Sequence, residues 1–505
     1  MSTGKVWLVG AGPGDVGLLT RKAEKVLKQG EVVVYDRLVG DGVLAMIPKS
    51  ARTIDVGKNA GNHTKNQEEI NQILLEEAQK GYRVVRLKGG DPFLFGRGGE
   101  ELELLTENQI PYEVVPGVAS PIAVPAYNGI PVTHRDYCSS LHIITGHKKA
   151  GAAYDIDFEA LVRTKGTLIF LMGVTALKDI CQNLLTAGME PEMPAAILQQ
   201  GTTAGQKRIV ATVATLPEEV ERQGIETPAI IVVGKVCGLA QEFEWYEKLP
   251  LAGYKVVITR PKDLNSQSAE KLRQRGAEVL ELPAIETRAI EENKRLEESL
   301  QNLDKYQWIA FTSPTGVRIF FEEMRKFHCD IRKLMGCKFA AVGTGTRKTV
   351  EQHGFYTDLI PEIFDGASLG ASLAKTCVPG DRILLPRAEI GGTEILDEIK
   401  KGSDLHVDDV PTYRTTYERA EYLDEQKLFE NGKIDCAVFT SASTVKGFVE
   451  ATEGLDYGLV TAACIGKQTK AAADACGMKT YMAEQATMDS LVDLVLELKA
   501  LKEQK

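Results

Sequence analysis

The sequence predicts an α/β protein with more than one domain. Short aliphatic segments, such as residues 5–9 and 31–36, alternate with charged helical segments along the whole chain. This alternation is typical of strands covered by helices. Because 505 residues exceed what one hydrophobic core supports, roughly two to four domains are expected. A Gly-rich loop after the first strand predicts a nucleoside site in the first half.

Composition excludes several classes of partner. A net charge of -10 argues against nucleic acid or an anionic membrane as the main target. No apolar run is as long as a membrane span, and the first residues show no signal-peptide pattern. The nine cysteines are scattered, without a C-x-x-C pair or a metal-like cluster with the seven histidines. We therefore expect free thiols, no metal and a reducing cytoplasm.

The Gly-rich loop spans residues 9–15, V-G-A-G-P-G-D, between the first strand and a helix expected over residues 20–29. Gly10 and Gly12 fit a dinucleotide fingerprint, but Asp15 stands where a third glycine belongs. Pro13 also removes one N–H donor, and a carboxylate at the helix mouth repels a diphosphate. The loop therefore favours a neutral or zwitterionic nucleoside such as S-adenosylmethionine over a nicotinamide dinucleotide.

Asp36 keeps the dinucleotide alternative open. It ends the apolar strand E-V-V-V-Y-D over residues 31–36. In a dinucleotide-binding unit, an acid at about this distance holds the ribose hydroxyl. A third interpretation is structural, since an acid can simply end the strand and cap the next turn.

Several further segments read as ligand-contacting loops. Residues 88–101, K-G-G-D-P-F-L-F-G-R-G-G-E-E, hold too many glycines for a stable strand or helix. Such glycines suit a backbone that must approach a ligand closely. Similar loops are V-P-G-V-A-S at 115–120 and G-I-P-V-T-H-R at 129–135, and apolar strands close at 145–147 and 171–173. Together these segments predict one ligand site.

Residues 5–236 resemble the uroporphyrinogen-III C-methyltransferases through V-G-A-G-P-G-D, Y-D-R-L-V at 35–39, the long motif at 88–101, G-I-P-V-T-H-R and T-G-H, in that order. The resemblance implies a two-lobed tetrapyrrole methylase fold, with S-adenosylmethionine in the cleft between the lobes. It also implies a homodimer formed through this half. The reaction implied is two successive methylations of uroporphyrinogen III to precorrin-2, for sirohaem or cobalamin.

The resemblance also assigns residue roles. Asp36 falls where the family places a proton acceptor and Lys58 where it places a proton donor. Such groups are needed because a pyrrole carbon attacks the methyl group in line and the macrocycle then loses a proton. Many relatives have a threonine near Ala119, so Ala119 is expected to contribute backbone alone. The implied donor-binding residues are Pro13, Gly89, Gly90, Asp91, Leu94, Ala119, Ser120, Met172 and Gly201.

The substrate implied by this resemblance is an octacarboxylate, so cationic partners are expected in an otherwise acidic protein. Arginine binds carboxylates bidentately. A solvated surface charge is the alternative for each candidate. The candidates are Arg37, Arg97, His134 and Arg135.

The second half begins after a polar and aromatic segment at residues 242–253, which reads as a linker. We predict a first enzyme over residues 1–245, a linker over 246–253 and a second, two-lobed enzyme over 254–505.

An internal repeat predicts the two lobes of the second half. W-I-A-F-T-S-P-T-G-V at 308–317 is echoed by C-A-V-F-T-S-A-S-T-V at 436–445. Two further pairs are 341–350 with 464–473 and 256–261 with 383–388. Each lobe should be a small, flavodoxin-like parallel sheet with helices on both faces. Hydroxyls at the helix mouths would form anion sites, or alternatively only cap those helices.

Residues 251–498 resemble the uroporphyrinogen-III synthases through V-I-T-R-P, F-T-S-P-T-G-V, P-T-Y-R-T, F-T-S-A-S-T-V and I-G-K-Q-T. The resemblance implies closure of hydroxymethylbilane with inversion of the last ring, loss of water and no cofactor. Tyr413 matches a cleft tyrosine that aids departure of the hydroxyl. With no paired carboxylates or His-centred dyad in this half, catalysis should be mostly conformational. The matching hydroxyl-bearing cleft residues are Thr312, Ser313, Thr346, Ser441 and Thr469.

The sequence thus favours a bifunctional enzyme of tetrapyrrole biosynthesis. Two alternatives stay open. One is an NAD-dependent oxidoreductase fused to a two-lobed anion-binding module. The other treats the second half as a non-enzymatic sensor that closes on a small anion.

Overall fold

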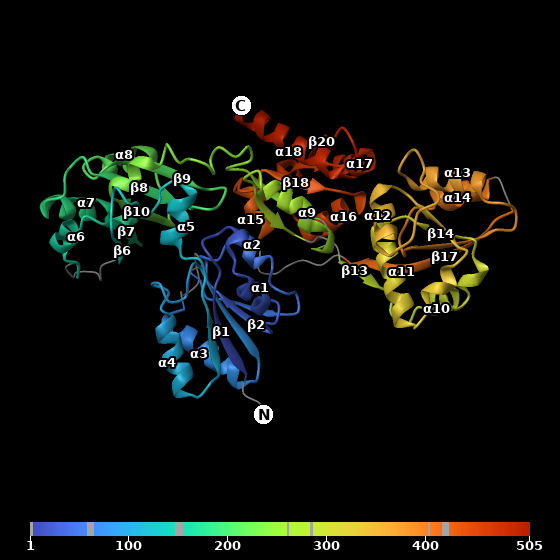
Figure 1. The fold of residues 1–505 in the computed structure, drawn as a ribbon, viewed down its shortest axis with the longest axis horizontal. Helices are drawn as coiled ribbons and strands as arrows, with labels where there is room; N and C mark the ends of the chain where they lie inside the picture. Colours follow the sequence, from blue (N-terminus) through green and yellow to red (C-terminus); the bar gives the residue numbers. More distant parts are fainter. Residues whose placement is uncertain are drawn as a thin grey trace. The chain divides into compact units, whose positions relative to one another are not determined.

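The residues of the computed structural model group into two compact units. The first comprises Met1–Pro283 and Arg419–Lys505, and the second comprises Ala284–Glu418 (Figure 1). The second unit therefore interrupts the first along the chain. The residues described are 4–57, 65–146, 155–259, 262–282, 286–401, 404–416 and 424–504.

The first sheet is entirely parallel and has the order β3-β2-β4-β1-β5. Its central strands are buried because helices cover both faces. On one face Val6 and Leu8 pack with Leu74 and Leu105 of two neighbouring helices. The strands are β1 (Lys5–Gly10), β2 (Val32–Tyr35), β3 (Arg52–Asp55), β4 (Arg83–Lys88) and β5 (Tyr112–Val115); the helices are α1 (Arg21–Leu27), α2 (Asp41–Leu44), α3 (Gln67–Gln79), α4 (Gly98–Glu107) and α5 (Ser120–Tyr127).

One sequence expectation for this region is wrong in part. The glycines at 98 and 99 were expected to lie in a loop, but they open α4. Arg97 precedes the helix with a left-handed φ of 56°. Glu101 and Leu105 of α4 are fully buried, so tertiary packing overrides the poor helix propensity of glycine.

The second sheet is mixed, with the order β6-β7-β10-β8-β9. Its first two strands are parallel, and the other pairs are antiparallel. The strands are β6 (Leu141–Thr145), β7 (Thr167–Leu171), β8 (Pro194–Gln199), β9 (Lys207–Thr212) and β10 (Ala229–Val233); the helices are α6 (Phe158–Thr164), α7 (Leu177–Thr186) and α8 (Leu216–Gln223).

The third sheet also belongs to the first unit and is entirely parallel, in the order β12-β11-β18-β19-β20. In chain order this is the 2-1-3-4-5 arrangement of flavodoxin-like folds. The strands are β11 (Lys255–Ile258), β12 (Glu278–Glu281), β18 (Cys436–Phe439), β19 (Thr461–Cys464) and β20 (Lys479–Met482); the helices are α9 (Lys262–Arg273), α15 (Glu425–Glu430), α16 (Ala442–Ala451), α17 (Lys467–Ala475) and α18 (Met488–Glu503).

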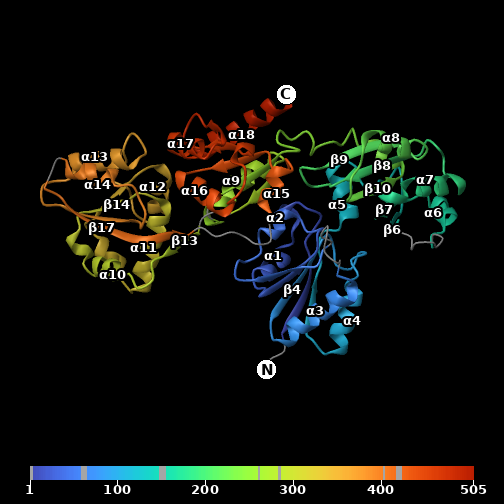
Figure 2. The same cartoon turned by 180° about the vertical axis from the view of Figure 1, so that it is seen from behind.

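The fourth sheet forms the second unit, in the order β13-β17-β16-β14-β15, with β13 antiparallel at one edge. Successive side chains of β14 alternate between two cores: Ile309 packs with residues of α10 and α11, and Trp308 packs with residues of α13 and α14. Figures 1 and 2 show α10 and α11 on one side of this sheet and α13 and α14 on the other. The strands are β13 (Glu286–Ala289), β14 (Trp308–Phe311), β15 (Lys338–Ala341), β16 (Arg382–Ala388) and β17 (His406–Thr416); the helices are α10 (Lys294–Gln301), α11 (Pro314–Lys326), α12 (Thr344–Gln352), α13 (Gly366–Thr376) and α14 (Glu394–Lys400).

The repeated motifs occupy matching places in the third and fourth sheets. The neighbours β11-β18-β19 in one sheet correspond to β16-β14-β15 in the other. Because β11 precedes its partners in the chain whereas β16 follows its own, the two lobes are circularly permuted relative to each other. The predicted pair of similar lobes is thus present, with a different chain order in each. Only the third sheet is entirely parallel, because β13 joins the fourth sheet in the antiparallel direction.

The division into residues 1–245, 246–253 and 254–505 stays a prediction, since the compact units separate the two lobes of the second half. The segment read as a linker is packed against the first half. Trp245 Nε1 donates to the Ala126 carbonyl at 2.9 Å, and the ring centroids of Tyr246 and Tyr127 lie 5.0 Å apart.

Candidate active sites

Three Gly-rich loops meet at the carboxyl edge of the first sheet, where β1, β4 and β5 end. Gly12 and Gly90 exchange both backbone hydrogen bonds, at 3.2 and 2.7 Å. Asp91 joins the other loop, because its Oδ2 accepts from the Gly117 amide at 3.0 Å. A Cβ on Gly117 would lie 2.2 Å from the Gly90 carbonyl oxygen, so glycine is required there. The carboxyl edge of a parallel sheet is where α/β proteins bind ligands.

Strained backbone gathers in the loops around this edge and in those that follow β7 and β8. Nine non-glycine residues of the described chain have positive φ, and five of them fall in these loops. Such strain persists only where the surroundings fix it, and it is concentrated at functional sites. Gly201, a predicted donor-binding residue, lies between two of the five. The five are Phe95, Arg97, Met172, Gln200 and Thr202.

The first loop offers few free donors for a diphosphate. The Ala11 amide donates to the Lys88 carbonyl at 2.8 Å, and the Gly12 amide is paired with Gly90. The Asp15 amide donates to Thr202 Oγ1 at 3.2 Å. The Asp15 carboxylate accepts from the Gly17 amide at 2.7 Å and from the Tyr127 hydroxyl at 2.6 Å. The loop is therefore fastened to the protein, which supports the argument against a nicotinamide dinucleotide.

A buried group of charges lies beneath the edge, next to Asp36. Glu101 Oε1 accepts from Lys88 Nζ at 2.6 Å and from Arg86 Nε at 3.1 Å, and all three residues are buried. Arg86 Nη2 also reaches Asp36 Oδ2 at 3.5 Å. Burial lowers the pKa of Lys88, and Arg86 lowers it further. Sequence reasoning assigned no role to Arg86, Lys88 or Glu101.

Glu101 is expected to be essential for the stability of this region. Glu101→Gln leaves Arg86 and Lys88 without their buried anion, which should reduce the free energy of unfolding by about 3 kcal/mol. Urea denaturation followed by circular dichroism measures the effect. Glu100→Gln on the same helix is the matched control, because its exposed pair with Arg97 contributes at most about 1 kcal/mol. Equal losses in the two variants would contradict the assignment.

Asp36 follows β2 and is about a quarter exposed, at 26 %. Its Oδ1 accepts from the Leu38 amide at 3.1 Å, and its Oδ2 faces Arg86. The carboxylate is therefore held in one orientation yet open to solvent, which suits a proton acceptor. Lys58, the predicted proton donor, lies outside the described residues.

The other predicted donor-binding residues lie in the same loops. Pro13 follows β1, and Gly89 and Leu94 follow β4. Ala119 is the N-cap of α5 and has no side-chain cap bond, and Ser120 is the first residue of that helix. Met172 follows β7 and is 54 % exposed.

Exposed apolar side chains on these loops were not predicted from sequence as a group. Leu38 follows β2, Phe93 and Phe95 follow β4, and Met172 follows β7; all four are between 43 % and 63 % exposed. Large apolar side chains exposed around a site indicate a surface that binds an apolar or aromatic ligand.

The predicted cations divide into two pairs. Arg37 and Arg97 follow the adjacent strands β2 and β4, so the structure brings them to the same edge as Asp36. Arg97 is paired bidentately with Glu100, at 2.8 and 2.5 Å.

The second pair of predicted cations, His134 and Arg135, lies between α5 and β6. His134 Nδ1 accepts from the Asp136 amide at 3.2 Å.

Tyr413 is the centre of the candidate site in the second unit. It is buried, and its hydroxyl lies 2.8 Å from Ser313 Oγ. Ser313 caps α11 and accepts from the Gly316 amide at 3.0 Å. Burial raises the pKa of Tyr413, although the bond with Ser313 opposes the shift. The phenol therefore keeps its proton near neutral pH and can act as a donor.

The remaining hydroxyls occupy matching positions in the repeat. Ser441 caps α16 as Ser313 caps α11, and Thr346 and Thr469 are buried at the third position of α12 and α17. Thr312 follows β14 directly. Capping thus accounts for part of the role of Ser313 and Ser441, but Thr346 and Thr469 are not caps.

The described residues contain neither a candidate metal cluster nor a candidate membrane span. No group of three or more His, Cys, Asp and Glu side chains there is arranged to hold a metal ion. In the same part of the chain, no helix is both long and apolar enough to cross a membrane.

Two family models match the chain, in different parts of it. Residues 5–217 match the family model described as tetrapyrrole (corrin/porphyrin) methylases. Residues 266–493 match the model described as uroporphyrinogen-III synthase HemD. The chain is similar to a crystal structure of a Thermus thermophilus uroporphyrin-III C-methyl transferase complexed with S-adenyl homocysteine (39 % identity, 46 % of this chain, 98 % of that chain, TM-score 0.41).

Two relatives cover most of the chain. The porphyrin biosynthesis protein HemD of Ruminiclostridium josui is 46 % identical over 99 % of both chains. The uroporphyrinogen-III C-methyltransferase of Bacillus subtilis is 40 % identical over 71 % of this chain and 74 % of its own length. The resemblances predicted from the motifs are thereby confirmed. The chain belongs to the family of porphyrin biosynthesis proteins that join a tetrapyrrole methylase to a uroporphyrinogen-III synthase, and it is a bifunctional enzyme with both activities.

Proposed function

We propose that the chain performs two consecutive steps. Its second half closes hydroxymethylbilane to uroporphyrinogen III, with loss of water and inversion of the last ring. Its first half then methylates that product twice to precorrin-2. The observation that supports this best is the presence of two different sites in one chain: an oriented carboxylate at a strand end, and a buried phenol bonded to a serine.

The methyl donor proposed for the first site is S-adenosylmethionine. The loops fit it because they present backbone, apolar side chains and the Asp91 carboxylate, while the loop amides that a diphosphate needs are bonded within the protein. When bound, S-adenosylmethionine supplies an activated methyl group. The residues proposed to hold it are Pro13, Gly89, Gly90, Asp91, Leu94, Ala119, Ser120, Met172 and Gly201.

Asp36 is the proposed proton acceptor. The Leu38 amide and Arg86 fix its two oxygens in different directions, so the carboxylate does not need to reorient when the macrocycle loses its proton. The exposed apolar side chains of Leu38, Phe93 and Phe95 would support the face of the macrocycle. Arg37, Arg97, His134 and Arg135 are proposed to bind its carboxylates, and Lys58 to act as proton donor.

In the second half, Tyr413 is proposed to donate a hydrogen bond or proton to the departing hydroxyl of the bilane. Ser313 Oγ accepts from the Gly316 amide, so its own proton can be donated to the phenol oxygen. The phenol proton is then available to substrate. Thr312, Thr346, Ser441 and Thr469 are proposed to bind the carboxylates of the bilane, and no cofactor is required.

The proposed assembly is a homodimer through the methyltransferase half, acting in the cytoplasm. The nine cysteines support the compartment, because all nine are free thiols and a reducing environment keeps them so. Sedimentation equilibrium of the purified chain tests the assembly: twice the chain mass is expected, and a monomer at micromolar concentration would contradict it.

Calorimetric titration separates the proposed methyl donor from the dinucleotide alternative. S-adenosylmethionine should bind with one site per chain, and NAD should show no heat of binding under the same conditions. Tight binding of NAD, without binding of S-adenosylmethionine, would overturn the proposed chemistry of the first site. The sirohaem and cobalamin branches share precorrin-2, so the titration does not need to distinguish them.

A further inference from the structure

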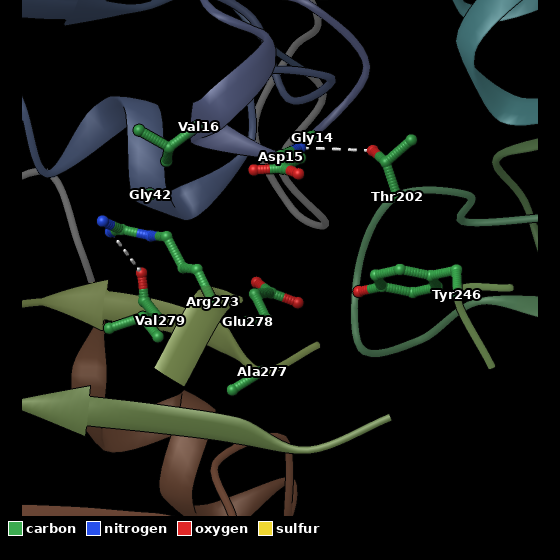
Figure 3. A pocket seen from close by; sticks show the side chains of 10 residues that line it. All are labelled: Gly14, Asp15, Val16, Gly42, Thr202, Tyr246, Arg273, Ala277, Glu278 and Val279. Atoms are coloured by element: carbon green, nitrogen blue, oxygen red, sulfur yellow. Dashed lines mark hydrogen bonds between the residues drawn. The ribbon is translucent and has the colours of Figure 1, made fainter. Parts of the chain in front are cut away.

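Within the first unit, the methylase loops contact a strand that belongs to the second half of the chain. Figure 3 shows a small hollow with Gly14, Asp15 and Thr202 on one side and Glu278 and Val279 of β12 on another. Residues 200–206 lie in the segment that matches the methylase family, whereas Glu278 lies in the segment that matches the synthase family. The contact therefore joins the two enzymes.

Glu278 uses both carboxylate oxygens in this contact. Its Oε2 accepts from the Ala204 amide at 2.7 Å, and its Oε1 lies 2.8 Å from Lys255 Nζ. Lys255 Nζ in turn lies 2.7 Å from Asp41 Oδ2, at the start of α2. The side chain of Lys255 is only 9 % exposed. A buried cation between two carboxylates, one from each half, fixes the position of Glu278.

Lys255 remains charged in this arrangement. Burial alone would lower its pKa, but Glu278 and Asp41 together outweigh burial, so the pKa of Lys255 is raised. Glu278 is thus held by a permanent charge on one oxygen while the other faces the methylase loop. A hydrogen bond to a charged acceptor is stronger than one between neutral groups.

The loop that Glu278 contacts is strained and carries a proposed donor-binding residue. Gln200 and Thr202 have φ values of 42° and 71°, and Gly201 lies between them. A Cβ on Gly201 would lie 2.4 Å from Val124 Cγ1, so this backbone is pressed against α5. Such a conformation persists only if its surroundings hold it. Within the methylase half, the Asp15 amide donates to Thr202 Oγ1, and Gln206 Oε1 accepts from the Thr202 amide at 3.0 Å. From the synthase half, Glu278 adds its bond with the Ala204 amide.

A purely structural role for the contact is the alternative. In that case any charged pair of β12 would matter equally, and the loss of Glu278 would affect stability without changing affinity for the methyl donor. Glu281, on the same strand, provides the comparison. It pairs with Arg273 at 2.7 Å, and no bond recorded for it reaches the methylase loops among the described residues.

We propose that Glu278, although it comes from the synthase half, is a positioning residue for the methyltransferase: it holds residues 200–206 in the conformation that binds the methyl donor. This inference rests on the proposed donor site at Gly201. It explains what the second enzyme contributes to the first beyond its own reaction.

The test compares methylation kinetics of Glu278 variants of the full chain, with uroporphyrinogen III supplied directly. Glu278→Ala removes the acceptor for the Ala204 amide, and the KM for S-adenosylmethionine should rise about tenfold. In Glu278→Gln the amide oxygen can still accept from the Ala204 amide, so the KM for S-adenosylmethionine should rise only about threefold. Synthase activity, measured on the same samples, reports whether the β12 lobe is folded.

Glu281→Ala is the matched control and should leave the KM for S-adenosylmethionine unchanged. An unchanged KM in Glu278→Ala, with synthase activity retained, overturns the inference. So does an equal rise in Glu281→Ala. Failure of the wild-type chain to methylate at all would instead refute the proposed function, so the two failures are distinguishable.

If Glu278→Ala loses synthase activity as well, hydrogen exchange in the wild-type chain decides. The Ala204 amide should exchange at least tenfold more slowly than a free amide of the same sequence, because it is hydrogen-bonded. Exchange at the free rate would contradict the contact itself.

Discussion

Replacing Asp36 by asparagine is expected to lower the rate of methylation about a thousandfold, within the range typical for loss of a general base. Asparagine keeps the size of the side chain and can still accept from the Leu38 amide, so the turn after β2 should survive. What is lost is the capacity to take a proton from the macrocycle. Single-turnover methylation of uroporphyrinogen III by the purified variant measures the effect, and synthase activity should be unchanged.

Asp55→Asn is the matched control for Asp36. Asp55 ends the neighbouring strand β3, and its Oδ1 accepts from the amide two residues on, at 2.7 Å, just as Asp36 does. The variant therefore removes the same charge from the same kind of turn, and it should methylate within about twofold of the wild-type rate, as is usual for a residue outside the chemical step. Comparable losses in both variants would refute the assignment of Asp36 as the base.

Replacing Tyr413 by phenylalanine is expected to lower the rate of ring closure about a hundredfold, the lower end of what a general acid contributes. The ring stays, so packing in the buried site changes little, but the proton donor is gone. Ser313→Ala should cost less, about tenfold, because the phenol keeps its proton and loses only its orientation. Conversion of hydroxymethylbilane to uroporphyrinogen III, with isomers separated chromatographically, measures both. Methylation of added uroporphyrinogen III should be unaffected.

Tyr306→Phe provides the control for Tyr413. Tyr306 is also a buried tyrosine of the second unit, and its hydroxyl donates to Asp408 at 2.7 Å. Its removal tests whether loss of any buried phenol in this unit impairs ring closure. We expect near-normal synthase activity for Tyr306→Phe. A loss as large as that of Tyr413→Phe would mean that the effect is one of stability.

Much of the first site could be predicted from sequence because it is built from local signals. Glycines before and after apolar strands, and acids at strand ends, mark the loops that the parallel sheet brings together at its carboxyl edge. Pro13 and Asp15 are local signals too, because they alone distinguish this loop from a dinucleotide fingerprint. Asp15 turns out to act chiefly by fastening the loop, through the Gly17 amide and Tyr127.

The buried charges could not be assigned a role in the same way, although a signal for them exists. Arg86 and Lys88 stand two residues apart in the buried part of β4, so their side chains point to the same face. Cations on one face of a central strand need a buried anion. The sequence does not identify Glu101 as this anion. Glu101 lies in α4, and the two glycines that open this helix predict a loop instead.

The arrangement of the second half could be predicted from the sequence only in part. The repeat predicted two similar lobes, but repeated motifs do not reveal which copies share a sheet. In the permuted order, β11 and β16 occupy matching places in their sheets, although β11 precedes its neighbours in the chain and β16 follows them. This order depends on pairing between strands that are distant in the sequence. Contacts between the halves, such as that of Glu278 with Ala204, leave no local sequence signal either.

A single incubation tests both proposed activities of the chain together. The purified chain is given hydroxymethylbilane and S-adenosylmethionine, with no other enzyme. The products are separated chromatographically, and their masses are measured by mass spectrometry. We expect a tetrapyrrole of the type III isomer that has gained two methyl groups. Accumulation of the unrearranged isomer would contradict the assignment of the second half, and a type III product without added methyl groups would contradict that of the first.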